Sequence, residues 1–208
     1  RMRLKNYAKK EKKQINLIYL SFIQERFLYR LSISDYREKF ILKGGILLYC
    51  FDLITRPTKD IDFLAQNVPN EINEIKKIIT QICKIEINDG VLFDTETLTA
   101  KIIAENRIYN GIRIKLWAYI GTIKQILQID IGFGDIIIPI SSIIEYPVLL
   151  DGNSPKIKVS SIESLIAEKF ESMIILSIIN SRMKDFYDIY SLSKNKSFQG
   201  KILYSAIK

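Results

Sequence analysis

The 208-residue sequence predicts an α+β fold, in which a mixed sheet with flanking helices is followed by a C-terminal helical lobe. Residues 112–120 and 123–133 alternate apolar and polar side chains, as half-buried strands do. Residues 14–31 and 72–82 instead repeat apolar side chains at helical spacing. The turn-forming string Asp-Gly-Asn-Ser-Pro at 151–155 is the clearest break in the chain.

The length suits one domain, or a compact core with a small lobe. We expect a core with an N-terminal helix at 1–150 and a helical lobe at 151–208. With 48% hydrophobic residues the chain can bury a substantial core.

The sequence shows no uncharged apolar run long enough for a membrane span and no signal-peptide pattern, which indicates a soluble, cytoplasmic protein with no membrane partner. Cys50 and Cys83 lack CxxC spacing and are expected to be buried, reduced thiols.

The amino-acid composition restricts which kinds of catalytic site the chain can form. The chain has no histidine, which excludes Ser-His-Asp and Cys-His hydrolases, histidine zinc sites and histidine general bases. Catalysis must therefore use carboxylates, lysine and metal. The net charge of +8 is concentrated at the ends, since residues 1–13 and 193–208 are strongly basic and the middle is net acidic. That pattern suits a cation-holding site that meets a polyanion, although charged ends also simply keep a chain soluble.

The first elements lead into a glycine pair. Residues 14–31 form an amphipathic helix whose apolar face repeats at Leu20, Ile23, Phe27 and Leu31. Residues 40–42 are typical of a short strand that enters Gly44-Gly45. A helix is expected at 46–54, ending before Pro57 because proline disfavours a helical residue before it.

The stretch Lys43–Phe63 carries the strongest chemical pattern. In a strand, Asp60 and Asp62 point to the same face, roughly 7 Å apart along the backbone. Paired carboxylates suit Mg²⁺, and Gly44 and Gly45 before a helix would let a phosphate approach backbone N–H groups. Each signal alone has an ordinary alternative: a solvated strand end for the acids and a simple turn for the glycines. The order of glycine pair, helix and Asp-x-Asp strand is much rarer.

The middle of the chain is expected to be mainly β-structure. Asn70 is a plausible N-cap for the helix at 72–82, and Asn88-Asp89-Gly90 is typical of a hairpin turn between strands at 84–87 and 91–93. The strand at 112–120 places its apolar residues on one face. Its other face could stack on nucleic acid, or be solvated or covered by a helix; it carries Arg113, Lys115, Trp117 and Tyr119.

Asp130 lies inside the apolar strand 123–133, where an unpaired charge would be costly. A metal shared with Asp60 and Asp62 would explain the residue. Pairing with a lysine would explain it equally simply.

The C-terminal region contains a second charged residue in an apolar pattern. Ser160 and Glu163 form a capping box that starts a helix through about residue 177. Lys169 falls on the apolar stripe of this helix and so faces inward, where it needs an anion: a carboxylate of the acidic cluster or a nucleotide triphosphate. Alternatively, its stem packs and its amine reaches water.

The last expected helix spans 181–193. Its inward residues would be Met183, Phe186 or Tyr187, and Tyr190. Arg182, Asp185 and Asp188 lie on a neighbouring face, where they would also fit a surface salt-bridge ladder.

Several segments together resemble the AbiEii/AbiGii toxin family of nucleotidyltransferases, which is similar to the DNA polymerase β type. They occur in family order and span nearly the whole chain: ERFLYRLS (25–32), FILKGGILL (40–48), RPTKDIDF (56–63), IDIGFGD (129–135), AEKFESMI (167–174) and SRMKDFYDIY (181–190). The resemblance implies a polymerase β-like core and a toxin with a separately encoded antitoxin, in type IV toxin–antitoxin or abortive-infection phage defence. Related toxins add nucleotides to tRNA 3′ ends.

The resemblance also implies roles for individual residues. Gly44 and Gly45, with Lys43 before them, match the glycine motif that cradles the NTP triphosphate, and Asp60 and Asp62 match the metal-binding motif. Lys169 matches a phosphate-contacting lysine and Asp185 an essential acid of undefined role. Many relatives have serine where this chain has Gly45, so a hydroxyl contact to the nucleotide is lost here.

These observations lead to one hypothesis and two rivals. The hypothesis is a Mg²⁺-dependent nucleotidyltransferase in which Asp60, Asp62 and Asp130 hold metal, and Asp130 helps bind it or accepts the acceptor hydroxyl's proton. The first rival keeps this chemistry but transfers to a small molecule or a protein side chain. The second is a non-catalytic module that binds an antitoxin or nucleic acid.

Overall fold

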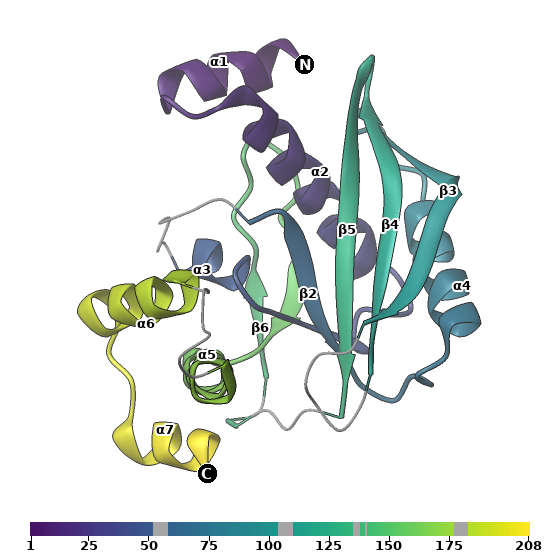
Figure 1. Ribbon diagram of the computed structural model, residues 1–208. Helices are drawn as coiled ribbons and strands as arrows, with labels where there is room; N and C mark the ends of the chain where they lie inside the picture. The colour runs from purple at the N-terminus through teal and green to yellow at the C-terminus, as the bar shows by residue number, and fades with distance from the viewer. Residues whose placement is uncertain (52–57, 104–109, 135–137, 140, 177–182) are drawn as a thin grey trace.

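The computed structural model describes most of the chain and shows a mixed α+β fold (Figure 1). The described residues are 1–51, 58–103, 110–134, 138–139, 141–176 and 183–208. Among them, no helix is both long and apolar enough to cross a membrane.

A seven-stranded mixed sheet, in the order β3-β4-β5-β2-β1-β7-β6, forms the centre of the fold. β2 runs parallel to β5 and β1 parallel to β7, whereas the other neighbouring pairs are antiparallel. The expected mixed sheet is therefore confirmed. Its strands are β1 (Phe40–Lys43), β2 (Asp60–Ala65), β3 (Val91–Ile103), β4 (Gly111–Ile120), β5 (Ile123–Phe133), β6 (Ser142–Glu145) and β7 (Lys156–Val159).

Two long helices, α2 (Ile15–Ser32) and α4 (Ile72–Cys83), pack on one face of the sheet, and α1 (Met2–Lys10) packs on α2. The ring of Phe27 on α2 lies 6.5 Å from that of Phe63 on β2 and 6.1 Å from that of Phe93 on β3. Because side chains alternate along a strand, the residues next to Phe63 and Phe93 point to the opposite face. The apolar face predicted for strand 112–120 is buried on the helix-covered side.

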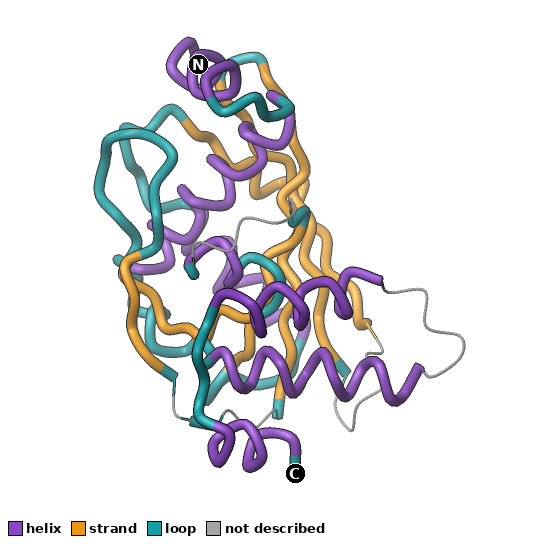
Figure 2. Tube along the Cα trace, turned by 90° about the vertical axis from the view of Figure 1, so that its left-hand side faces the viewer, coloured by secondary structure: helices purple, strands orange, loops and turns teal. Residues whose placement is uncertain are grey.

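The C-terminal helices are α5 (Ile162–Leu176), α6 (Met183–Asn195) and α7 (Gly200–Ile207). α5 packs against α6 and α7, and Figure 2 shows the two longer helices side by side. β7, which lies beyond residue 151, pairs with both β1 and β6 and so belongs to the sheet. The division at 150 stays a prediction.

Some local expectations were wrong. Residues 84–87 are not a strand, because α4 ends at Cys83 and β3 pairs with β4 instead. α4 begins after Glu71 rather than after Asn70, whose side chain donates to the Asn110 carbonyl. The cap of α5 is Ser161, whose Oγ accepts from the Ser164 N–H, and not Ser160. The helix after the glycine pair, α3 (Leu47–Cys50), is shorter than expected, and residues 52–57 lie outside the described residues.

The inward face of α6 was also predicted wrongly. Met183, Phe186, Tyr187 and Tyr190 are exposed, whereas Asp185 and Asp188 are buried. The two acids turn inward because Lys169 of α5 lies there, as described below. The alternative of a surface ladder is therefore wrong for both acids, and Arg182 lies outside the described residues.

Candidate active site

Three aspartates meet on the sheet face opposite α2 and α4. Because β2 and β5 are parallel and in register, Asp62 lies directly beside Asp130, while Asp60 points to the same face two residues earlier. One carboxylate oxygen from each residue lies within 4.8 Å of the other two. The structure thus brings Asp60, Asp62 and Asp130 together, as the sequence predicted.

The donor set fits a hard divalent cation. All three side chains offer carboxylate oxygens, the ligands that Mg²⁺, Ca²⁺ and Mn²⁺ prefer. Three carboxylates this close repel one another unless positive charge lies nearby. A metal ion at this point would supply that charge.

Arg113 of β4 is a partner of Asp130 that the sequence analysis missed. Its Nε donates to Oδ1 at 2.8 Å and its Nη2 to Oδ2 at 2.6 Å, and the Gln128 amide lies 3.3 Å from each oxygen. Asp130 is only 5% exposed, so this fork offsets much of the cost of burial. The two residues lie on neighbouring strands of a hairpin, and the opposite charges of Arg113 and Asp130 near the two ends of that hairpin were the signal available in the sequence.

Gly44 forms the edge of the site. It has φ +71°, and a Cβ there would collide with the carboxylate of Asp62. Only glycine fits both conditions. The carbonyls of Gly44 and Gly45 accept from the Leu47 and Leu48 N–H groups, which turns the chain sharply into α3.

Lys43 connects this edge to the C-terminal helices. It lies opposite Asp62 in the β1–β2 register, and its Nζ is 3.3 Å from Glu168 Oε1 of α5. Lys43 is buried, so its ammonium faces the Glu168 carboxylate rather than bulk water. Thr58 supports the other side of the site by donating from Oγ1 to Asp60 Oδ1 at 2.9 Å.

Lys169 belongs to a second cluster. The prediction that it faces inward is confirmed, since the residue is 7% exposed. Its anions are two acids of α6: Asp185 Oδ1 lies 3.1 Å from Nζ and Asp188 Oδ2 lies 2.7 Å from it. Lys169 is therefore paired with Asp185 and Asp188, and not with Asp60, Asp62 or Asp130. The part played by Asp188 was not predicted, because the acid spacing on α6 also fits a solvent-facing ladder.

Comparison with known proteins places this arrangement in a family. Residues 26–208 match the model of the nucleotidyl transferase AbiEii toxin family, Type IV TA system. The chain belongs to this family. It is therefore a nucleotidyltransferase of the AbiEii type, and the resemblance seen in the sequence is confirmed.

Solved structures share the fold of this AbiEii-family chain. A protein from H. pylori described as a candidate nucleotidyltransferase is 17% identical, with a TM-score of 0.61 over 92% of this chain and 74% of that one. JHP933 from Helicobacter pylori gives the same identity and TM-score over 92% of this chain and 72% of its own. At this identity the likeness supports the fold. A search of curated proteins found no match.

Proposed function

We propose that this protein transfers a nucleoside monophosphate from an NTP to the 3′ end of tRNA, in a Mg²⁺-dependent reaction. The observation that carries the proposal is the convergence of Asp60, Asp62 and Asp130 beside Gly44, on a chain of the AbiEii family. A carboxylate cluster next to a turn that excludes side chains suits a polyphosphate and its cation.

The acidic residues bind metal in this proposal. Asp60, Asp62 and Asp130 would hold Mg²⁺, which would supply positive charge to stabilise the attacking and leaving oxygens. The acceptor hydroxyl oxygen forms a bond to the α-phosphorus, and the bond from that phosphorus to pyrophosphate breaks. The hydroxyl proton passes to Asp130 or to solvent, and Arg113 keeps the Asp130 carboxylate in its orientation throughout.

The triphosphate lies along Lys43, Gly44 and Gly45. Gly45 offers a backbone N–H but no hydroxyl. Lys169 adds a contact from α5: an ammonium has three N–H donors, so a phosphate oxygen can join the carboxylates of Asp185 and Asp188. Asp185 then acts by holding Lys169 in place.

The biological setting follows from the family. A type IV system pairs the toxin with an antitoxin encoded separately, which need not contact it, and we propose a role in abortive-infection phage defence. The basic termini favour a polyanionic acceptor over a small molecule or a protein side chain.

The test is incubation of the purified protein with total tRNA, Mg²⁺ and each labelled NTP in turn. Label should enter tRNA with one preferred NTP, and Asp60→Ala should abolish it. Asp35→Ala, which removes an exposed aspartate, is the matched control. A folded wild-type protein that labels no tRNA with any NTP would refute the tRNA proposal, and label retained in Asp60→Ala would refute the site.

A further inference from the structure

The side chains on the same sheet face as the three aspartates lie in rows that cross neighbouring strands. One row across the sheet reads Lys101, Arg113, Asp130, Asp62 and Lys43, because these residues are direct neighbours on β3, β4, β5, β2 and β1. The next row contains Lys115, Gln128 and Asp60. The rows are about 7 Å apart along the strands.

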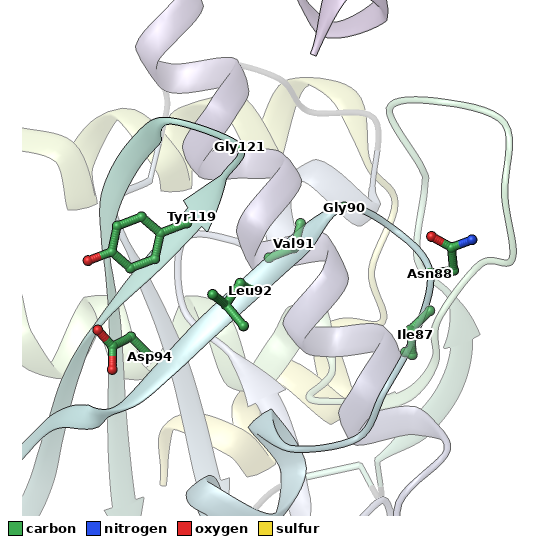
Figure 3. Close-up of a pocket in the computed structure, with 8 residues that line it drawn as sticks. All are labelled: Ile87, Asn88, Gly90, Val91, Leu92, Asp94, Tyr119 and Gly121. Atoms are coloured by element: carbon green, nitrogen blue, oxygen red, sulfur yellow. The ribbon is translucent and has the colours of Figure 1, made fainter.

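Two further rows carry aromatic rings. Trp117 is the next same-face residue on β4 after Lys115, and Tyr119 follows it near the β4–β5 hairpin. Figure 3 shows Tyr119 beside Leu92 and Asp94 of β3, in an open pocket at the end of the sheet. Lys115, Trp117 and Tyr119 thus form a line of about 14 Å along β4, and it starts in the row of Asp60, from which Lys115 is separated by Gln128 of β5.

Lys124 of β5 completes this surface. Its Nζ lies 4.0 Å from the centre of the Trp117 ring and 5.8 Å from that of Tyr119. The lysine is exposed, as are Lys101 on β3 and Ile126, which is 44% exposed between Lys124 and Gln128. We name Lys101, Lys115, Trp117, Tyr119 and Lys124 the basic–aromatic face.

We propose that the basic–aromatic face binds the single-stranded 3′ segment of a nucleic-acid acceptor and guides its terminal hydroxyl to the aspartates. The inference rests on the proposed function, whose acceptor it describes. Bases stack on Trp117 and Tyr119, while backbone phosphates meet Lys101, Lys115 and Lys124. The Lys124 ammonium, already over the indole ring, moves to a phosphate when a base takes its place.

Shape and charge both favour a nucleic acid as the occupant. Flat rings on a sheet, spaced by lysines, are how sheet-based modules hold unstacked RNA bases. A small acceptor would need an enclosed pocket, whereas this face is an open line. Asp94 beside Tyr119 repels phosphate but accepts hydrogen bonds from base amino groups, so base edges rather than backbone should lie at that end.

The chain contains one tryptophan, Trp117, so its fluorescence reports directly on this face. We would titrate the NTP-free protein with a short single-stranded oligoribonucleotide and follow tryptophan fluorescence, together with the anisotropy of labelled RNA. Stacking should quench the tryptophan. Trp117→Ala and Tyr119→Ala should each raise the RNA Kd about tenfold, whereas Trp117→Phe should retain most of the affinity. Lys115→Ala should lower the slope of log K against log salt by roughly 0.7.

Matched controls exclude general effects of substitution. Tyr204→Ala removes an exposed tyrosine on α7, and Lys77→Ala removes an exposed lysine on α4; both should bind RNA as the wild type does. The Kd for NTP should be unchanged in every variant of the face, because the triphosphate lies at the glycine turn.

The outcomes separate this inference from the proposed function. RNA binding without quenching, equal RNA affinity in Trp117→Ala, or no RNA binding at all would overturn the inference, even if the enzyme transfers nucleotides to another acceptor. Quenching and tenfold losses in a protein that transfers nothing to tRNA would support the face and refute the tRNA reaction.

Discussion

Arg113 holds Asp130 through two parallel hydrogen bonds that join neighbouring antiparallel strands. The same row continues directly to Asp62 on the other side of Asp130. Asp130 is therefore fixed from one side by a guanidinium, and on the other side it faces the carboxylates of Asp60 and Asp62. The orientation of this third carboxylate therefore depends on Arg113, a side chain that would not itself hold the proposed metal.

We predict that Arg113→Lys weakens metal binding and transfer by about 10- to 100-fold, the usual cost of losing a residue that orients a ligand. Lysine keeps the charge but cannot form the two-pronged pairing. The measurement is a Mn²⁺ titration by electron paramagnetic resonance, together with the Mg²⁺ dependence of transfer. Arg37→Lys, at an exposed arginine, is the control. Wild-type Mn²⁺ affinity in Arg113→Lys would show that the pairing does not organise the site.

Gly44→Ala should destabilise the protein more than Gly121→Ala. Both glycines have positive φ, but a Cβ at Gly121 meets nothing within 4 Å, whereas at Gly44 it collides with Asp62. The backbone alone costs about 1–2 kcal/mol. Urea denaturation should show that loss for Gly121→Ala and a clearly larger one for Gly44→Ala, which should also lose transfer. Equal losses would mean that Asp62 moves aside freely.

Lys169→Met should lower the free energy of unfolding by about 3–5 kcal/mol, because it removes the buried ammonium that both carboxylates contact. Lys156→Met, which breaks an exposed pair with Glu145, should cost about 0–1 kcal/mol. Urea denaturation of both variants measures the difference. The double variant Lys169→Met/Asp188→Asn should recover part of the loss, since it removes one of the two buried negative charges. A single variant as stable as Lys156→Met would contradict the buried pairing.

The two thiols should react at very different rates. Burial raises the pKa of the Cys83 thiol to about 12, from an ordinary value of 9.0, whereas Cys50 is half-buried. At pH 8 a maleimide should label Cys50 first, and Cys83 only after unfolding. Equal labelling in the native protein would show that Cys83 is accessible.

The same shift has a consequence for stability. A raised thiol pKa keeps the proton on the folded protein, so the free energy of unfolding should fall as pH rises above about 9, where the unfolded thiol ionises. Urea denaturation at a series of pH values measures this fall. Cys83→Ala should remove the part of the pH dependence that this thiol contributes.

The sequence predicted those features whose cause is local. Alternation in 112–120 and helical spacing in 14–31 and 72–82 gave elements that the structure confirms. Asp60 and Asp62 were found because two-residue spacing fixes a common face. Asp130 was found because a charge in an apolar strand needs a partner.

What the sequence did not predict depends on neighbours that only the fold supplies. Arg113 was placed on a face that could stack on nucleic acid, be solvated or be covered by a helix, because its actual partner lies on another strand. The buried face of α6 was predicted wrongly because apolar spacing normally marks the buried side of a helix. Here the acidic side is buried instead, since Asp185 and Asp188 pair with the buried Lys169 of α5. The Ser160 cap was one residue off because both Ser160 and Ser161 suit a helix start.

Glu168 and Lys169 are consecutive residues on α5, yet they form ion pairs with different parts of the molecule. Glu168 pairs with Lys43 beside the glycine turn, and Lys169 pairs with two aspartates of α6. Consecutive helical residues point about 100° apart, so this single turn of α5 contacts the glycine turn on one side and α6 on the other. A change at Asp188 that lets α5 rotate would shift Lys43 without touching it. Distance from the proposed nucleotide site is therefore a poor guide to which α6 substitutions leave nucleotide affinity intact.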